Sequence, residues 1–366
     1  ICFYGSLEFR DRLILILITC FVLACIVIAL GVDLIIVFLV LLLIFTVFYV
    51  TNKFIQGLEK QQKGKHKEAI RDYDDVIEAS RYIYPLLKIL NLTLRLNPKT
   101  NLNISANKDN EAHPSGMISE KEYPYIYKLA EYMLRNTNIF TDAYNNRGSS
   151  KATLGKHEEA IADFEKAIEL DPKFALAHYN RGNSKAILGK HEEAIADCDK
   201  AIELNSEFVF AYYNRGNSKA ILGKHEEAIA DYDRAIELNP KFVFAYYNRG
   251  NDKATLGKHE GAIADYGTVI ELNPKFAAAY NNRGLEKAIL GKHEEAILDY
   301  DEAIELGLKI AGVYYNRGNS KASLGKYEEA ITNYDKAIEL NPTNANSYKE
   351  MRQEVQKKLD DSQSST

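Results

Sequence analysis

Apolar residues follow two different patterns along this chain. From Leu13 to Val50 they form a nearly continuous run in which Asp33 is the only charge. From residue 143 to 344 they recur instead at intervals of three and four positions, the spacing that marks one face of a helix. Short polar breaks separate these helical stretches. The pattern therefore predicts an apolar N-terminal segment followed by a long series of amphipathic helices.

The apolar run is too long for one perpendicular membrane crossing. As a single helix its residues would extend about 57 Å, against a hydrocarbon core of about 30 Å. Gly31, Val32 and Asp33 divide the run into residues 13–29 and 34–50, each close to one crossing. A turn there also brings the Asp33 carboxylate to the headgroups, which avoids a cost of at least about 2.5–3.5 kcal/mol at mid-membrane. We expect a transmembrane helical hairpin, and hence an integral membrane protein attached to the lipid bilayer through residues 13–50.

Basic residues on both sides of the run predict its orientation. Arg10 and Arg12 precede it, and lysines follow it from Lys53 to Lys67. Because positive charge is retained on the cytoplasmic side, both ends of the hairpin are expected in the cytoplasm. Everything that follows the membrane anchor, residues 1–50, should then face the cytoplasm.

The second pattern is an internal repeat with a period of 34 residues. An Arg-Gly pair recurs with this spacing in six copies, at Arg147, Arg181, Arg215, Arg249, Arg283 and Arg317. Each copy predicts a helix, a turn at Gly-Lys and a second helix. In the copy around Arg215, the small residues Gly216, Ala228 and Ala235 allow two helices to cross closely, and Pro240 ends the second helix. One such pair cannot bury its own apolar face, but a stack of pairs can.

With its 34-residue period and its pattern of Gly, Ala, aromatic, Ala and Pro, the chain resembles the tetratricopeptide repeat (TPR) family. The resemblance implies an all-α fold, a right-handed superhelical solenoid, with six repeats over residues 143–344. A divergent repeat is expected at 51–84, with its first helix continuing out of the apolar run. Residues 85–142 are interpreted as an irregular helical insertion with a mobile loop at 97–120, and residues 345–366 as a capping helix and tail.

The repeats depart from the family pattern in a coordinated way. Arg stands where the family usually has Leu before the Gly, and Lys stands where it usually has an aromatic residue three positions after it. Sixteen residues after each Arg, the second helix carries Asp163, Asp197, Asp231, Asp265 or Asp299, and Asn333 in the last copy. This fixed offset predicts an Arg–Asp contact within or between repeats.

The first helix of each repeat lines the concave surface in this family, and this points to a partner-binding groove. The Asn side chains there offer both a donor and an acceptor to the backbone of a peptide, similar to the asparagine ladder in the TPR arm of O-GlcNAc transferases. An alternative stays open, in which the Asn make hydrogen bonds inside the repeats. The candidate groove residues are Tyr179, Asn180, Asn183, Ile187, Tyr213, Asn214, Asn217, Ile221, Tyr247, Asn248, Asn251, Asn282, Tyr315, Asn316 and Asn319.

Composition and motifs limit which classes of partner and which kinds of chemistry are expected. With 46 basic and 51 acidic residues the net charge is −5, which does not suggest a nucleic-acid partner. The clamp by which chaperone-linked TPR proteins hold the C-terminal carboxylate of heat-shock proteins needs Lys at places that here are Tyr179, Tyr213 and Tyr247. No catalytic constellation, metal-binding spacing or cofactor motif is recognised, and the recurring Gly-Lys-His-Glu-Glu is interpreted as a surface or packing motif. Cys198 is expected to be a small core residue.

We therefore expect no enzyme and no cofactor, but a membrane-anchored scaffold or adaptor. Its concave groove would bind an extended or helical segment of another protein. The alternative is an architectural TPR array that assembles with itself and has no dedicated peptide ligand.

Overall fold

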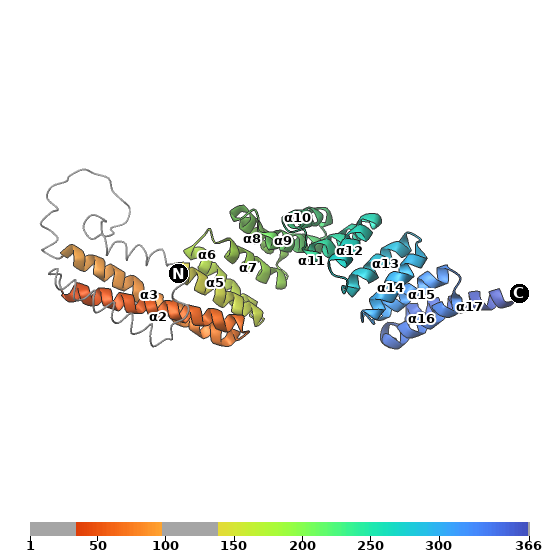
Figure 1. The fold of residues 1–366 in the computed structure, drawn as a ribbon, viewed down its shortest axis with the longest axis horizontal. Coiled ribbons are helices and arrows are strands. Elements are labelled where there is room, and N and C mark those ends of the chain that lie inside the picture. The colour runs from red at the N-terminus through yellow and green to blue at the C-terminus, as the bar shows by residue number, and fades with distance from the viewer. Residues whose placement is uncertain (1–33, 97–137, 365–366) are drawn as a thin grey trace. The chain divides into compact units, whose positions relative to one another are not determined.

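The structure, a computed structural model, describes residues 34–96 and 138–364 (Figure 1). Within these ranges the chain forms α-helices and one short 3-10 helix at Pro342–Asn344, and it contains no strand. The all-α prediction is therefore confirmed for the described residues. The expected first membrane helix at 13–29, the turn at 31–33 and the loop at 97–120 lie outside them. The chain divides into two compact units, residues 1–184 and 185–366.

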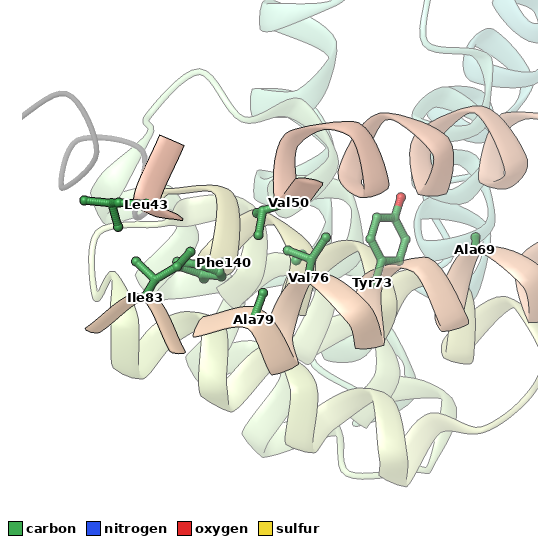
Figure 2. Close-up of a cluster of buried hydrophobic side chains, with 9 residues drawn as sticks. Leu43, Val50, Ala69, Tyr73, Val76, Ala79, Ile83 and Phe140 are labelled. Atoms are coloured by element: carbon green, nitrogen blue, oxygen red, sulfur yellow. The ribbon is translucent and has the colours of Figure 1, made fainter. Parts of the chain in front are cut away.

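Unit 1 consists of antiparallel helix pairs. Helix α2 packs on α3, α3 on α5 and α5 on α6. The bounds of the helices are α2 Leu34–Gln62, α3 His66–Leu96, α5 Asn138–Thr153, α6 His157–Leu170 and α7 Ala175–Ile187. Helix α7 begins in unit 1 and ends in unit 2. Figure 2 shows the core shared by α2, α3 and α5, in which Val50 of α2, Val76 and Ile83 of α3 and Phe140 of α5 belong to one buried cluster.

Helices α2 and α3 pack closely in unit 1, where the sequence predicts a divergent repeat at 51–84, and the repeat itself stays a prediction. Gly57 of α2 lies so close to α3 that a Cβ atom there would stand 2.7 Å from the Tyr73 ring. The Tyr73 hydroxyl donates a hydrogen bond of 2.7 Å to Gln61, which closes the pair on its other side. Helix α2 runs without interruption from Leu34 in the apolar run to Gln62, beyond Gly57. Helix α3 continues beyond the repeat to Leu96.

The transmembrane hairpin is not supported. Among the described residues one helix is long and apolar enough to cross a membrane, with a candidate span at Phe38–Gln62 and a mean hydropathy of 2.1. Leu43 and Val50 of the run are buried against the neighbouring helices. Packing against protein therefore accounts for some of the apolar residues of the run, which the hairpin prediction did not take into account.

Unit 2 stacks helix pairs of nearly uniform length. In each pair a first helix of 13 residues, such as α9, packs on a second helix, such as α10, and α17 packs on α16 at the end. The bounds are α8 His191–Leu204, α9 Val209–Ile221, α10 His225–Leu238, α11 Val243–Thr255, α12 His259–Leu272, α13 Ala277–Ile289, α14 His293–Glu305, α15 Ala311–Ser323, α16 Tyr327–Leu340 and α17 Asn346–Ser364.

Residue size explains how each pair closes. A Cβ atom on Gly216 would stand 2.8 Å from the Tyr232 ring, so only glycine permits this crossing. Ala228 and Ala235 are fully buried on the facing helix, in one cluster with Tyr232. Gly223 has a φ of 75°, a left-handed conformation that disfavours other residues, and it reverses the chain between the helices. Cys198 is buried in unit 2 as expected, and burial raises the pKa of its thiol to about 12.

Candidate partner-binding surface

The predicted Arg–Asp contact is present and holds the two helices of a repeat together. Arg215 donates two hydrogen bonds to the Asp231 carboxylate, from Nε to Oδ2 at 3.0 Å and from Nη2 to Oδ1 at 2.5 Å. The same pairing joins Arg147 to Asp163, Arg249 to Asp265 and Arg283 to Asp299, and Arg317 donates to the side-chain oxygen of Asn333. The Asp side chains are buried, so each pair is more than a surface contact.

Arg215, Arg249 and Arg317 also reach the preceding repeat, whereas Arg283 has Gly267 at the corresponding position. Arg215 donates to Asp199 at 2.5 Å, sixteen residues before it, and Arg249 donates to Asp233 in the same way. Burial alone would lower the pKa of the Arg215 guanidinium, but the hydrogen bonds to Asp231 and Asp199 outweigh that effect and raise it. The Arg that replaces the family's Leu thus links three consecutive helices by charge-assisted hydrogen bonds.

The Asn residues of the predicted groove are engaged within the array. Asn217 accepts a hydrogen bond of 2.8 Å from the buried Tyr232 hydroxyl and another of 2.8 Å from Asn248 of the next repeat. Asn248 also donates to the Tyr213 hydroxyl at 3.1 Å. The same network recurs one repeat later among Asn251, Tyr266, Asn282 and Tyr247.

The remaining predicted residues show related arrangements. Asn319 accepts a hydrogen bond from the Tyr334 hydroxyl at 2.9 Å, and Tyr315 packs its ring 4.9 Å from that of Tyr348 on the capping helix α17. In unit 1, Asn180 donates to Asn145 at 2.9 Å. Internal hydrogen bonding is the alternative that the sequence left open for the Asn residues, and it is what these contacts show. Their part in partner binding stays a prediction.

An exposed aromatic row lies along these first helices, and sequence reasoning identified only two of its six residues, Tyr213 and Tyr247. Phe210 and Phe244, the second residues of α9 and α11, are 52% and 53% exposed. Their rings connect through Phe242, at 5.5 and 6.4 Å, and Phe244 reaches Phe276 at 6.1 Å. Tyr213 and Tyr247 join from one side, each 4.9 Å from the next Phe ring. We call Phe210, Tyr213, Phe242, Phe244, Tyr247 and Phe276 the aromatic row.

The row continues into an apolar helix face. On α9, Phe210, Tyr213, Asn217 and Ile221 follow at intervals of three and four residues, so they share one face. Ile221 at the end of this face is 66% exposed. The face carries no charge, because Arg215 and Lys219 on the same helix both pair with the buried Asp231. The face presents apolar area and aromatic rings, and the side-chain oxygen of Asn217 accepts hydrogen bonds from Tyr232 and from Asn248 of the next repeat.

The recurring His side chains act in packing between repeats. His225 Nδ1 lies 2.9 Å from a carboxylate oxygen of Asp252, and His259 Nδ1 lies 2.6 Å from one of Glu286. Both acidic residues are buried at a position where other repeats have Ser. Within the described ranges, no group of three or more His, Cys, Asp or Glu is arranged to hold a metal ion.

Comparisons with known proteins agree with the architecture. Family models described as tetratricopeptide repeat match residues 175–208, 209–242, 277–306 and 311–344, and a model described as TPR repeat matches 148–186 and 250–288. The chain belongs to the tetratricopeptide repeat family. No curated protein gives a significant match to it.

Solved structures of TPR proteins resemble parts of the chain. PilF of Pseudomonas aeruginosa is 20% identical with a TM-score of 0.52, over 58% of this chain and 97% of that one, which supports the fold. MamA is 30% identical with a TM-score of 0.43, over 44% of this chain and 95% of that one. YrrB, described as a TPR protein with an unusual peptide-binding site, is 28% identical with a TM-score of 0.47, over 51% of this chain and 97% of that one.

Proposed function

We propose that this TPR protein is a membrane-attached scaffold that binds a segment of another protein along the aromatic row. The observation that carries the proposal is the exposure of Phe210 and Phe244, with Phe210 on the uncharged face of α9 that ends at the exposed Ile221. Exposed apolar rows of this kind are uncommon on surfaces that face only water. Aromatic residues are also the side chains that most often dominate binding energy at protein interfaces.

The energetics favour apolar burial over hydrogen bonding as the source of affinity. Association costs roughly 4–15 kcal/mol in lost freedom. Asn217, Asn248 and Asn251 already hydrogen-bond within the array, so their remaining capacity adds about 1 kcal/mol or less each. Full burial of a Phe or Ile side chain contributes about 1.5–3 kcal/mol, and a side chain that is half exposed in the free protein can contribute roughly half of this free energy when a ligand covers it. A useful ligand therefore inserts several apolar side chains between consecutive first helices.

Membrane attachment is the second part of the proposal. It is supported by the apolar run at residues 13–50 and by the candidate span at Phe38–Gln62. The lysines from Lys53 to Lys67 favour a cytoplasmic location for the repeats. Digestion of the repeats by a protease added to the cytoplasmic side of sealed vesicles is the expected result, and protection on that side would contradict this orientation.

Affinity capture in detergent tests the binding role. We would compare the wild-type chain with the double variant Phe210→Ser/Phe244→Ser, which removes the exposed rings and leaves the hydrogen bonds of Asn217 and Asn248 in place. Leu298→Ser is a matched control, because Leu298 is 69% exposed on the second helix α14, away from the row. Captured partners should be lost with the double variant and retained with the control.

The alternative function, an architectural array that assembles only with itself, gives a different result. Self-association measured by light scattering would then be the property that changes, and no second protein would be captured by the wild type. Equal capture by the wild type and the double variant would remove the aromatic row as the binding surface. The proposal contains no catalytic step and no cofactor.

A further inference from the structure

Helices α2 and α3 extend far beyond the repeat to which they belong. The first helices of regular repeats begin seven residues before their Gly, as α9 begins at Val209 before Gly216. In that register α2 would begin at Val50, yet it begins at Leu34. The second helices end 22 residues after the Gly, as α10 does at Leu238, and this register would end α3 at Ala79 instead of Leu96. We call residues 34–49 and 80–96 the overhang.

The two extensions match in length and lie side by side. Helices α2 and α3 are antiparallel, joined by a short turn at residues 63–65, and they pack along their length (Figure 1). About sixteen residues of helix correspond to about 24 Å. Leu43 of α2 and Ile83 of α3 belong to the same buried cluster, so the overhang begins as a continuation of the repeat's own core.

One face of the overhang exposes apolar side chains to its surroundings. Phe38, Leu42, Phe45 and Tyr49 follow at intervals of four, three and four residues, which places them on one face of α2. Phe38 is 64% exposed and Phe45 55%. Tyr82 of α3 is exposed as well, and together with Leu42 and Tyr49 it lines an open cavity of about 580 Å³ between the helices. We call Phe38, Leu42, Phe45 and Tyr49 the apolar stripe.

The charge of the molecule changes abruptly where the overhang begins. Beyond Tyr82, α3 carries Lys88 and Arg95 and no acidic residue, and residues 34–49 of α2 carry no charge at all. Before that point the same two helices hold an ionic network, in which Lys53 lies 2.7 Å from Asp75 and Lys60 lies 2.5 Å from Asp72. Apolar surface combined with basic and no acidic residues complements an anionic lipid surface.

The path of the chain argues against a crossing of the bilayer by this pair. If α2 crossed from Tyr49 to Leu34, α3 beside it would end at Leu96 on the opposite side. Residues 97–137 would then have to return to Asn138, and they contain no apolar run long enough to cross. Helix α5 begins at Asn138 and its Phe140 packs with Ile83, on the side of the repeats.

We propose that the overhang lies in the membrane–water interface, with Phe38, Leu42 and Phe45 of the apolar stripe against the acyl chains and Tyr49 and Tyr82 at the level of the headgroups. Tyrosines favour that level because one end of the ring is apolar and the other is polar. The inference rests on the proposed membrane attachment and specifies where the described part of the chain meets the lipid. The repeats from α5 onward remain in water.

Single tryptophan reporters test this arrangement, since the chain contains no Trp. Phe38→Trp and Phe45→Trp place the reporter on the apolar stripe, and Ile55→Trp is a matched control at an exposed position of α2 within the repeat. Each full-length variant is reconstituted into vesicles of phosphatidylcholine and phosphatidylglycerol. The lipids carry bromine either near the headgroup or near the end of the acyl chain, and iodide serves as the aqueous quencher. Unchanged helical circular dichroism checks the fold of each variant.

At positions 38 and 45 we expect similar quenching by the shallow bromine, with about half of the emission lost, and little by the deep bromine. At position 55 iodide should quench and neither lipid should. Quenching at 38 by the deep bromine, with 45 quenched by the shallow one, would mean a crossing helix and would overturn the inference. Protection of both positions from lipid and iodide would also overturn the inference, because it would mean that protein covers the stripe. Quenching of both positions by iodide would overturn it as well.

Flotation of the vesicles separates this inference from the proposed membrane attachment. If the full chain floats with the vesicles but the stripe reporters do not sense lipid, the attachment holds and the interfacial location is wrong. If the chain stays at the bottom of the gradient, the attachment itself is wrong. Flotation together with shallow quenching supports both.

Discussion

The Tyr300 hydroxyl is buried without a hydrogen-bond partner, because Leu285 stands at the position where other repeats have the Asn that accepts this bond. In the two preceding repeats the equivalent hydroxyls donate to Asn217 and Asn251, fifteen residues earlier. Leu285 stands fifteen residues before Tyr300 and has no polar atom to offer. The network of Asn and Tyr side chains is therefore interrupted in the fifth repeat, and the consequence is measurable.

Removing the two hydroxyls should have opposite effects on stability. Tyr232→Phe deletes a donor and leaves the Asn217 oxygen with one bond fewer, so we expect the free energy of unfolding to fall by about 1 kcal/mol. Tyr300→Phe removes a hydroxyl that is buried and unpaired, so stability should stay unchanged or rise by up to about 1 kcal/mol. Urea unfolding followed by circular dichroism compares the two. An equal loss in both variants would show that the Tyr300 hydroxyl has a partner.

Restoring the ionic link at Gly267 should stabilise the array between its fourth and fifth repeats. Asp199, Asp233 and Asp301 each precede a paired Arg by sixteen residues, and Gly267 holds that place before Arg283. A Cβ atom at Gly267 meets nothing within 4 Å. We expect G267A to add about 0.5–1 kcal/mol from helix propensity alone.

The charged substitution separates the ionic contribution from the helical one. G267D should be more stable than G267N, its uncharged counterpart of the same shape, by about 0.5–1 kcal/mol if the new carboxylate pairs with Arg283. Thermal unfolding of G267A, G267N and G267D provides the comparison. Equal stability of the Asn and Asp variants would mean that Arg283 does not reach this position.

The buried Asp252 should make stability depend on pH. Burial raises the pKa of its carboxyl, the contact with His225 acts in the opposite direction, and the second carboxylate oxygen has no partner. A raised pKa means that the folded chain binds the proton more tightly than the unfolded chain, whose carboxyl titrates near pH about 3.9. The wild type therefore loses stability as the pH rises from about 3.9 through the raised folded value.

Asp252→Ser, which restores the residue found at Ser218 and Ser320, removes that loss. The variant should gain stability over the wild type at about pH 7 and gain less at about pH 4. His225, whose imidazole contacts Asp252, is retained in both chains, so the difference reports the carboxyl. Urea unfolding at both pH values gives the two free-energy differences, and a gain that is larger at the lower pH would contradict the assignment.

The repeat and its ionic pairs were predictable because their signals lie within one period. Gly216, Ala228 and Tyr232 are close in sequence and in space, and the constant offset of sixteen residues identified the partner of Arg215 before any geometry was known. The network of Asn217 and Asn248 was not predictable as such, since it joins side chains of different repeats, 31 residues apart. A sequence does not distinguish an Asn whose amide is hydrogen-bonded within the array from an Asn whose amide is free to bind a partner.

Two other features lay beyond sequence reasoning for physical reasons. Phe occupies this position in only two of the six repeats, at Phe210 and Phe244, so these two exposed rings do not follow the 34-residue period. The other four repeats have Asp142, Leu176, Ala278 and Gly312 there. The apolar run was interpreted by length and hydropathy as membrane crossings. Its second half also packs against protein, since Leu43 and Val50 are buried against α3 and α5. Hydropathy does not distinguish burial in protein from burial in lipid.

Photo-crosslinking at Phe210 tests the central claim most directly. A photoreactive phenylalanine analogue replaces Phe210 in one full-length chain and Leu298 in another, and the products formed in intact membranes are mapped by mass spectrometry. The account predicts that position 210 crosslinks to a defined segment of a second protein, rich in apolar residues, and that position 298 does not. Crosslinks from position 210 only to other copies of this chain, or the same products from both positions, would contradict it.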